Sequence, residues 1–339
     1  MRRCLFAALL PLVAAALVLA VIGAACGSDS GSLTIYSGRS ETLVGPILER
    51  FSKQTGIDIR VRYAETTELT ATILEEGDNS PADIFFAQDA GALGALQDRG
   101  RLQALPQPLL ALVPSAFSSP QGLWVGISGR ARVVAYNPEK VSVTDLPDSI
   151  LGFTDPKWKG RIGWPPTNGS FQAFVTALRL IEGEQAAAAW LRGIEANNPK
   201  EFPNNPAALQ AVANGEVHVA FINHYYLFQA QNEQGGSINA RNHYLKGGDA
   251  GALVNVAGAA ILDTAGNKSD AERFIEFMLS REAQEYFATE TFEYPLVAGV
   301  SINPALPQLA ALEPPQIDLS NLSDLEGTLK LLRDTGVLP

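Results

Sequence analysis

The first third of the chain alternates short apolar runs with longer segments of helical periodicity. Residues 33–37, 57–63 and 83–86 are rich in β-branched and aromatic residues, which indicates short strands. Between them, residues 42–54 and 67–76 place apolar side chains three and four positions apart, which predicts amphipathic helices. The order β-α-β-α-β is typical of a parallel sheet whose strands are connected by helices. In such sheets, ligands gather at the carboxyl ends of the strands.

A second series of elements begins near Arg132 and predicts a second α/β unit. The chain length of 339 residues agrees, because domains commonly hold about 150 residues. Further strands are expected at 132–137, 161–164, 217–223 and 258–262, and helices from 171 and at 207–213, 269–279, 282–288 and 325–334. The pattern therefore predicts an α/β fold of two units.

Two adjacent tyrosines follow the predicted strand at 217–223. Asn223 is a favourable N-cap and residues 227–231 favour a helix, so we expect Tyr225 and Tyr226 in its first turn. Two phenol oxygens beside the free N–H groups of a helix start are suited to a hard cation together with an anion. Local sequence leaves a second interpretation open, in which the pair only fills the wall of a cleft.

The N-terminus has the pattern of an export signal. Arg2 and Arg3 precede the apolar run 5–22, and small residues then lead to Cys26, which predicts a lipoprotein-type signal peptide over 1–25. Cys26 would carry the lipid, and residues 26–32 would form a flexible tether. The run is also close to the length that spans a bilayer, and a glycine stands where the lipoprotein motif usually has leucine. The chain has 2 cysteines, in the leader and at the cleavage point, so the mature body would have no disulfide.

The charge and the motif content exclude several classes of function. The chain has 25 basic and 36 acidic residues, a net charge of −11, and no long basic run, which argues against a nucleic-acid partner. The 3 histidines are scattered, and no nucleophile elbow, metal-binding histidine pair or phosphate-binding loop of an NTPase is present. We therefore expect a binding protein and not an enzyme.

A series of motifs, in order along most of the chain, resembles the ferric-ion-binding proteins of bacterial ABC importers, which are type II extracytoplasmic solute-binding proteins. The motifs lie at 33–38, 75–85, 128–133, 156–160, 207–216, 223–226, 249–253 and 293–296. The resemblance implies a periplasmic-binding-protein-like fold, with two lobes that close like a hinge over a ligand. The N-terminal lobe would hold 33–131 and 256–303, and the C-terminal lobe 132–255 and 304–339.

The resemblance implies that Tyr225 and Tyr226 bind ferric iron as phenolates, since this hard cation prefers oxygen donors. The chain departs from the family at two other ligand positions, where Ser40 replaces a histidine and Gln88 a glutamate. The next residue, Asp89, could supply the missing carboxylate. The secondary metal-site candidates are thus Gln88, Asp89, Tyr136 and Ser40. His224 is expected to turn away from the cleft.

Relatives of this kind use carbonate or phosphate as a synergistic anion, and residues that match their anion contacts are present. Arg39 and Arg130 offer forked donors for a bidentate oxyanion. Their alternative role is a salt bridge at the lobe interface, and the asparagines could instead cap helices or turns. The anion-site candidates are Arg130, Arg39, Asn168, Gly169, Ser170, Asn205 and Asn223.

The expected function is capture of ferric iron with a synergistic anion and its delivery to a membrane permease and that permease's ATPase. The protein would be a monomer, anchored outside the cell membrane through Cys26, and periplasmic where an outer membrane exists. Because two ligands are replaced, the alternative is the same fold binding an oxyanion or a small organic ion without iron.

Overall fold

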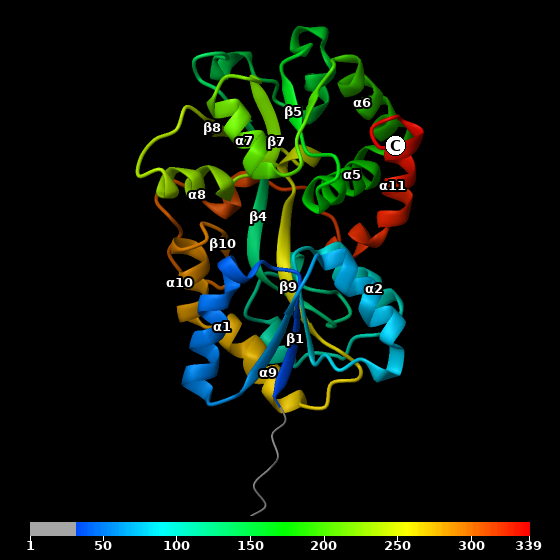
Figure 1. Ribbon diagram of the computed structural model, residues 1–339, viewed down its shortest axis with the longest axis vertical. Helices are drawn as coiled ribbons and strands as arrows, with labels where there is room; N and C mark the ends of the chain where they lie inside the picture. Colours follow the sequence, from blue (N-terminus) through cyan, green and yellow to red (C-terminus); the bar gives the residue numbers. More distant parts are fainter. Residues whose placement is uncertain (1–31) are drawn as a thin grey trace, which may run out of the picture. The chain divides into compact units, whose positions relative to one another are not determined.

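The computed structural model describes residues 32–339 (Figure 1). The predicted signal peptide, the lipidation site Cys26 and nearly all of the tether lie outside the described residues. Within 32–339, the structure contains no helix that is both long enough and apolar enough to cross a membrane.

The first lobe opens as the sequence predicts. Strands β1, β2 and β3 are parallel, with β1 in the middle, and Ile35 of β1 lies opposite Val61 and Ile84. Helices α1 and α2 connect them and bury apolar faces on the sheet, among them Phe51 and Leu69. The elements are β1 (Leu33–Ser37), α1 (Glu41–Thr55), β2 (Ile59–Tyr63), α2 (Thr66–Glu76) and β3 (Ile84–Ala87). The predicted β-α-β-α-β order is therefore confirmed.

The rest of the first lobe comes from distant parts of the chain. Two helices near residue 280 pack beside α1, and Phe274 contacts Phe51 with ring centroids 5.3 Å apart. Its elements are α3 (Ala90–Asp98), α4 (Gln107–Leu110), α9 (Lys268–Met278), α10 (Arg281–Thr289) and β10 (Tyr294–Pro295).

The second lobe has its own sheet and its own apolar core. In this core Trp164, Phe171 and Trp190 are almost fully buried between the sheet and the helices. Its elements are β5 (Ile162–Trp164), α5 (Gly169–Glu182), α6 (Glu184–Ala196), β6 (Lys200–Glu201), α7 (Asn205–Ala213), β7 (Val219–Asn223), α8 (Tyr225–Glu233), β8 (Arg241–His243) and α11 (Leu325–Asp334).

Two long strands join the lobes. β4 (Val125–Tyr136) pairs with β9 (Val254–Ile261) and β10 along its first half, and with β7 and β8 along its second half. Figure 1 shows β4 and β9 side by side through the waist of the described part. The residues at the middle of β4 therefore belong to both lobes.

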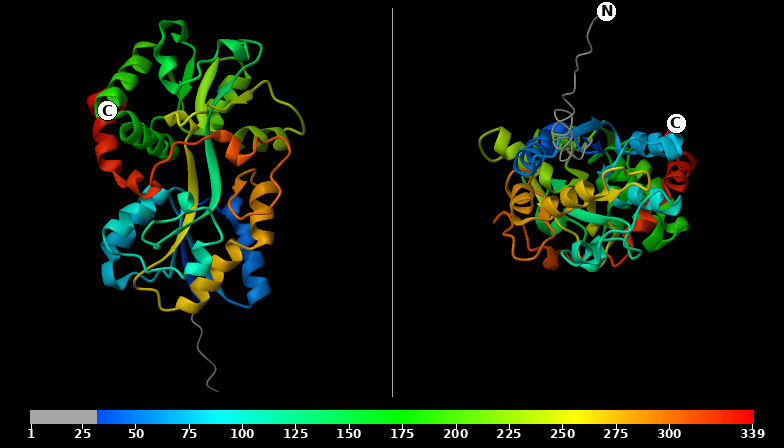
Figure 2. Two further views of the ribbon diagram at one scale, coloured as in Figure 1. Left: turned by 180° about the vertical axis from the view of Figure 1, so that it is seen from behind. Right: turned by 90° about the horizontal axis from the view of Figure 1, so that it is seen from below.

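The C-terminal segment contacts both lobes. Leu306, Leu312, Leu319 and Leu322 are buried in the core of the first lobe, whereas Leu332 is buried in that of the second. Between them, the Glu313 carbonyl oxygen accepts from Gly248 N–H of the second lobe at 3.0 Å, so the segment runs along the waist in contact with both lobes. Figure 2 shows this segment passing behind the waist before it reaches α11.

Close backbone packing fixes the crossing segment on α3. The carbonyl oxygens of Leu322 and Ser320 lie where a Cβ on Gly91 or Gly94 would come within 2.5 and 2.2 Å. Only glycine allows an approach this close. The two glycines of α3 therefore hold the segment against the first lobe.

Candidate functional site

The tyrosine pair lies in the first turn of α8, directly after β7, as predicted. The two rings stack with centroids 4.1 Å apart. Asn223 does not cap this helix. It ends β7, its Oδ1 accepts from Arg132 Nη1 at 3.4 Å, and His224 takes the N-cap position without a side-chain cap bond. The strand ends at Asn223 as predicted, and the N-cap lies one residue later than the capping pattern suggested.

The hydroxyl groups of both tyrosines are free for a ligand. Within residues 32–339, no protein group hydrogen-bonds to either hydroxyl, although only 1% of Tyr225 is exposed. Burial and the neighbouring Tyr226 raise the pKa of Tyr225 well above its usual value, against the opposing effect of Arg39 and Arg130. The phenol of Tyr225 is therefore neutral until a cation displaces its proton.

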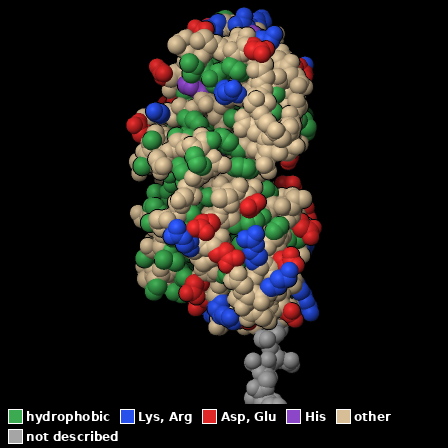
Figure 3. Space-filling view, turned by 90° about the vertical axis from the view of Figure 1, so that its left-hand side faces the viewer, with side chains coloured by type: hydrophobic (Ala, Val, Ile, Leu, Met, Phe, Trp, Pro, Cys, Tyr) green, Lys and Arg blue, Asp and Glu red, His purple; other side chains and the backbone are tan. Residues whose placement is uncertain are grey.

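A cavity of about 430 Å³ opens beside the pair, between the start of α1, α8 and the end of α10. Its walls bring together five of the predicted site residues: Arg39, Ser40, Gln88, Tyr225 and Tyr226. Figure 3 shows the side of the molecule on which α1 and α8 lie. Acidic and basic side chains are mixed over its lower half, and neither charge forms a continuous patch there. The charge that matters for a ligand thus lies inside the cavity.

Two buried arginines of the first lobe lie near the pair: Arg39 lines its cavity, and Arg130 acts electrostatically on Tyr225. Arg39 donates from Nη2 to Glu293 Oε1 at 2.7 Å, and Arg130 donates from Nη2 to the carbonyl oxygen of Gln88. The salt-bridge interpretation of Arg39 is therefore confirmed. However, Nε of Arg39 and both Nε and Nη1 of Arg130 are buried without a partner in the described residues. Such orphaned N–H groups are suited to an oxyanion.

A third buried arginine, Arg132, was missed by the sequence analysis. It donates to the carbonyl oxygen of Phe221 at 3.0 Å, and its guanidinium carbon lies 5.1 Å from the ring centroid of Phe174. Among the described residues, no carboxylate forms an ion pair with it. Burial lowers the pKa of Arg132 to about 9, with Tyr226 opposing this, so the group stays charged at neutral pH. The alternation of Arg130 and Arg132 within a buried strand was the available signal, because such residues share one face.

The charge in the site is unbalanced. Arg39 and Arg130 share the buried carboxylate of Glu293, whereas buried Arg132 has no ion pair among the described residues; the two other carboxylates that line the cavity, Glu233 and Glu290, are exposed. Buried charges are normally compensated by a partner or a ligand. The arrangement therefore favours an added anion.

The predicted asparagine cluster forms at the start of α5. Asn168 Oδ1 accepts from Ser170 N at 3.1 Å and from Asn205 Nδ2 at 3.0 Å, so the capping role of Asn168 is confirmed. Oδ1 of Asn205 is buried without a partner among the described residues. Gly169 lines a different, smaller cavity. Phe171, in the same turn, has its ring centroid 5.9 Å from the Arg132 guanidinium carbon, which places this cluster next to the arginine.

His224 is fully buried, and both ring nitrogens are engaged. Nδ1 accepts from Ala131 N–H at 3.1 Å, so Nε2 carries the hydrogen and donates to the Phe292 carbonyl oxygen at 2.9 Å. Burial lowers its pKa to about 3, although these hydrogen bonds oppose the shift. His224 is therefore neutral and has no free nitrogen for a metal.

The structure does not bring Asp89 and Tyr136 to the tyrosine pair. Asp89 Oδ1 accepts from Ala92 N at 3.1 Å and caps α3, and its side chain lines a separate cavity of about 110 Å³. Tyr136 lies at the far end of β4, opposite Val219, and packs on the second-lobe core. Neither lines the cavity of the pair.

Asp89→Ala tests this placement. We expect the variant to lose about 1 kcal/mol of stability, because a helix N-cap is removed, and to keep its metal affinity within about twofold. Thermal unfolding and a competitive metal titration measure the two quantities. A large loss of metal affinity would restore Asp89 as a ligand.

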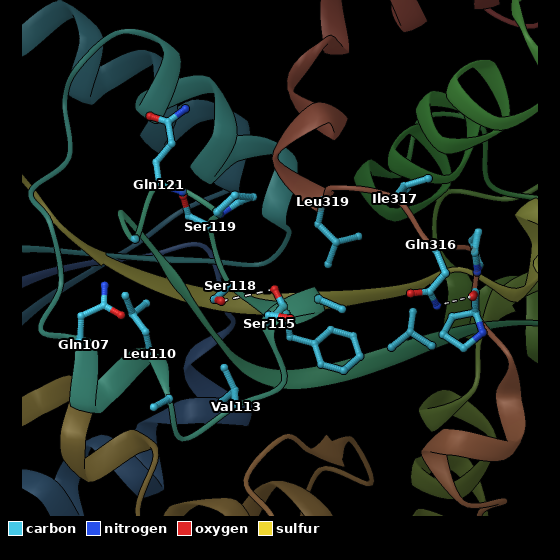
Figure 4. Close-up of a pocket in the computed structure, with 18 residues that line it drawn as sticks. Gln107, Leu110, Val113, Ser115, Ser118, Ser119, Gln121, Gln316, Ile317 and Leu319 are labelled. Carbon is cyan, nitrogen blue, oxygen red and sulfur yellow. Dashed lines mark hydrogen bonds between the residues drawn. The ribbon is translucent and has the colours of Figure 1, made fainter.

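A larger cavity of about 690 Å³ lies elsewhere in the first lobe (Figure 4). The loop from Gln107 to Gly122 and the segment 314–319 form its walls, and glutamines such as Gln121 and Gln316 point from both sides. None of the described residues that line it is charged. It therefore lacks the groups that a hard cation or an oxyanion needs.

Within residues 32–339, no three histidine, cysteine, aspartate or glutamate side chains gather to form a metal site. A metal held by this part of the chain would therefore need other donors, such as the two phenols. This agrees with the replacement of two expected ligands by Ser40 and Gln88.

Comparison with known proteins gives consistent matches. Residues 79–320 match the family model described as bacterial extracellular solute-binding protein. The chain is 36% identical over 311 residues to the major ferric iron-binding protein of Neisseria meningitidis serogroup B, covering 90% of this chain and 93% of that one. It is 34% identical over 330 residues to the Fe(3+)-binding periplasmic protein of Serratia marcescens, covering 96% of each. Among solved structures, iron-bound HitA from Pseudomonas aeruginosa matches with a TM-score of 0.85 and 38% identity, covering 90% of this chain and 99% of that one.

Proposed function

The chain belongs to the bacterial extracellular solute-binding protein family, and from this premise we propose that it captures ferric iron with a synergistic anion between its two lobes. One observation carries the proposal. The hydroxyls of Tyr225 and Tyr226, free of protein partners in the described chain, share a cavity with a buried arginine that has an unused N–H group. The relatives are named for ferric iron, so binding of an oxyanion or organic ion without iron is not favoured.

The chemistry of the residues supports a division of roles. The two phenols lose their protons and bind the hard ferric ion as phenolates. Arg39 and Arg130 hold the anion, whose oxygens complete the coordination that Ser40 and Gln88 leave open. Carbonate or phosphate fits these forked donors. Arg132 and the cluster of Asn168, Ser170 and Asn205 add positive charge and amide groups on the second lobe.

The proposal includes the transport step and the place of the protein. The loaded protein delivers iron to a membrane permease driven by an ATPase, as expected of a solute-binding protein of an ABC importer. It acts as a monomer outside the cell membrane, held there by the lipid on Cys26. Mass spectrometry of the protein isolated from membranes tests the lipid, and its absence would contradict the anchor.

The metal content after loading tests the function. Purified protein is incubated with ferric nitrilotriacetate and bicarbonate, separated by gel filtration and analysed for iron. We expect about one iron per chain, as for one coordination site built on the tyrosine pair. No retained iron, with or without any anion, would contradict the proposal.

Iron binding at neutral pH is expected to release about two protons per ferric ion from the phenols, one from each, and about one more where bicarbonate binds as carbonate. Because binding removes protons, the iron affinity rises with pH by about tenfold per unit for each proton released. Calorimetric titration in buffers of different ionisation enthalpy gives the number of protons. Tyr225→Phe should lower it by about one. A value near zero in the wild type would show that the phenols are not the ligands.

A further inference from the structure

The segment between α10 and β10 contacts both parts of the proposed site, the tyrosine pair that would bind the metal and the arginines that would bind the anion. Phe292 has a φ of +59°, in the left-handed region that a bulky residue rarely adopts. Its neighbour Tyr294 pairs with Gly129 of β4, so the segment is part of the first lobe. A strained backbone of this kind persists only where its surroundings hold it.

The residues that hold this backbone belong to the tyrosine helix of the second lobe. His224, directly before Tyr225, donates from Nε2 to the Phe292 carbonyl oxygen at 2.9 Å. The rings of Phe292 and Phe228 stack with centroids 6.0 Å apart, and Gln229 Nε2 donates to the Thr291 carbonyl oxygen at 3.4 Å. The left-handed turn therefore presents its carbonyl groups to the start of α8.

The next residue, Glu293, holds the arginine half of the site. It is fully buried and accepts hydrogen bonds from Arg39 Nη2 at 2.7 Å, Ser128 Oγ at 3.1 Å and Thr291 Oγ1 at 3.2 Å. Nε of Arg130 lies 4.0 Å from the same carboxylate. The carboxylate thus determines which N–H of Arg39 is used and leaves its Nε free.

We propose that residues 291–293, which we call the bridge segment, are a positioning element that couples the anion half of the site to the metal half. At one end, the Phe292 carbonyl oxygen is held by His224, which precedes Tyr225. At the other end, Glu293 orients Arg39 and lies beside Arg130. Return of Phe292 to an ordinary φ would withdraw its carbonyl from His224 and shift Glu293, so a change at one end of the segment is transmitted to the other end. An anion that fixes the arginines therefore stabilises the tyrosine helix in its binding position, and iron acts in return on the anion. The inference rests on the proposed ferric function.

The test measures the coupling factor, which is the iron association constant with bicarbonate divided by that without it. Iron is supplied from ferric nitrilotriacetate in bicarbonate-free buffer under argon, or with bicarbonate added. His224→Leu cuts the link to the tyrosine helix, and Glu293→Gln cuts the link to Arg39. Coupling between two sites is commonly about 5- to 150-fold, and we expect both variants to lower the wild-type factor at least about fivefold.

Gln284→Leu is the matched control. Gln284 is buried in the first lobe and makes hydrogen bonds that hold the chain after β10, including 2.7 Å bonds with Ile127 O and Leu296 N. Its loss weakens the same region without touching the bridge segment, so the coupling factor should stay at the wild-type value. If His224→Leu does not fold, Phe228→Ala removes the ring stacking at the same end and takes its place.

The outcomes separate the inference from the function. If the wild type binds iron but both bridge variants keep the wild-type coupling factor, the inference about the bridge segment is wrong and the ferric function stands. An equal fall in Gln284→Leu would also overturn it, because the effect would then reflect general weakening. Absence of iron binding in the wild type would instead overturn the ferric function.

Discussion

Replacing Tyr225 and Tyr226 together by phenylalanine is expected to lower the ferric association constant at least about 1000-fold. Changes outside the ligand shell of a metal commonly cost about 10- to 100-fold, and this variant removes two anionic ligands. The fold should persist, because neither hydroxyl is hydrogen-bonded within the described residues and the stacked rings are retained. Competition with citrate measures the constant, and circular dichroism confirms the fold.

Tyr136→Phe provides the control for this result. The residue lies at the far end of β4, so its loss should leave iron affinity within about twofold, as for a change without ligand contact. Full iron affinity in the double phenylalanine variant would show that the metal is held elsewhere. A large loss in Tyr136→Phe would make it the third phenolate.

Arg130→Leu is expected to lower iron affinity in bicarbonate by about 100-fold or more, since removing one partner of a buried charge interaction commonly costs about 2–5 kcal/mol. The variant removes two N–H groups, Nε and Nη1, that are buried without partners among the described residues. Without bicarbonate the affinity should change little, because the phenols are intact. Iron titrations over a range of bicarbonate concentrations measure the effect. The bicarbonate concentration that gives half of the full increase in iron affinity should be higher in the variant than in the wild type.

Arg179→Leu is the matched control, because Arg179 pairs with Glu184 and Asp324 at the periphery of the second lobe. It should leave the bicarbonate dependence unchanged. An equal loss with and without bicarbonate in Arg130→Leu would assign this arginine a structural role only.

The parts of the fold that follow from local periodicity could be predicted from the sequence. The β-α-β-α-β opening and the place of the tyrosine pair in the first turn of α8 depend on neighbours a few positions away. The predicted N-cap at Asn223 is wrong by one residue, because Asn223 still pairs with Arg132 of β4 as the last residue of β7 and the helix begins after it. End positions of elements are decided by tertiary pairing as much as by capping propensity.

The parts that depend on distant contacts could not be predicted. Asp89 was considered as a ligand because α3 was not foreseen, and the two glycines that weaken its helical pattern are required by the crossing C-terminal segment. Glu293 holds Arg39 from 254 positions away, and no local pattern reveals that pair. The path of the C-terminal segment likewise depends on which core accepts each of its leucines.

The site also explains how a chain without two expected ligands can still serve ferric iron. Ser40 and Gln88 line the cavity but contribute only neutral oxygen atoms. Three buried arginines against one buried carboxylate supply positive charge for an added anion. In the proposed function the anion supplies the negative ligand charge that the protein lacks, and iron binding should therefore depend on it strongly.

The visible spectrum of the wild-type protein during titration with ferric citrate, with and without bicarbonate, tests the central claim most directly. The account predicts a broad phenolate-to-iron charge-transfer band that saturates at about one iron per chain and depends on bicarbonate. The absence of any such band, whichever anion is supplied, would contradict ferric binding by the tyrosine pair.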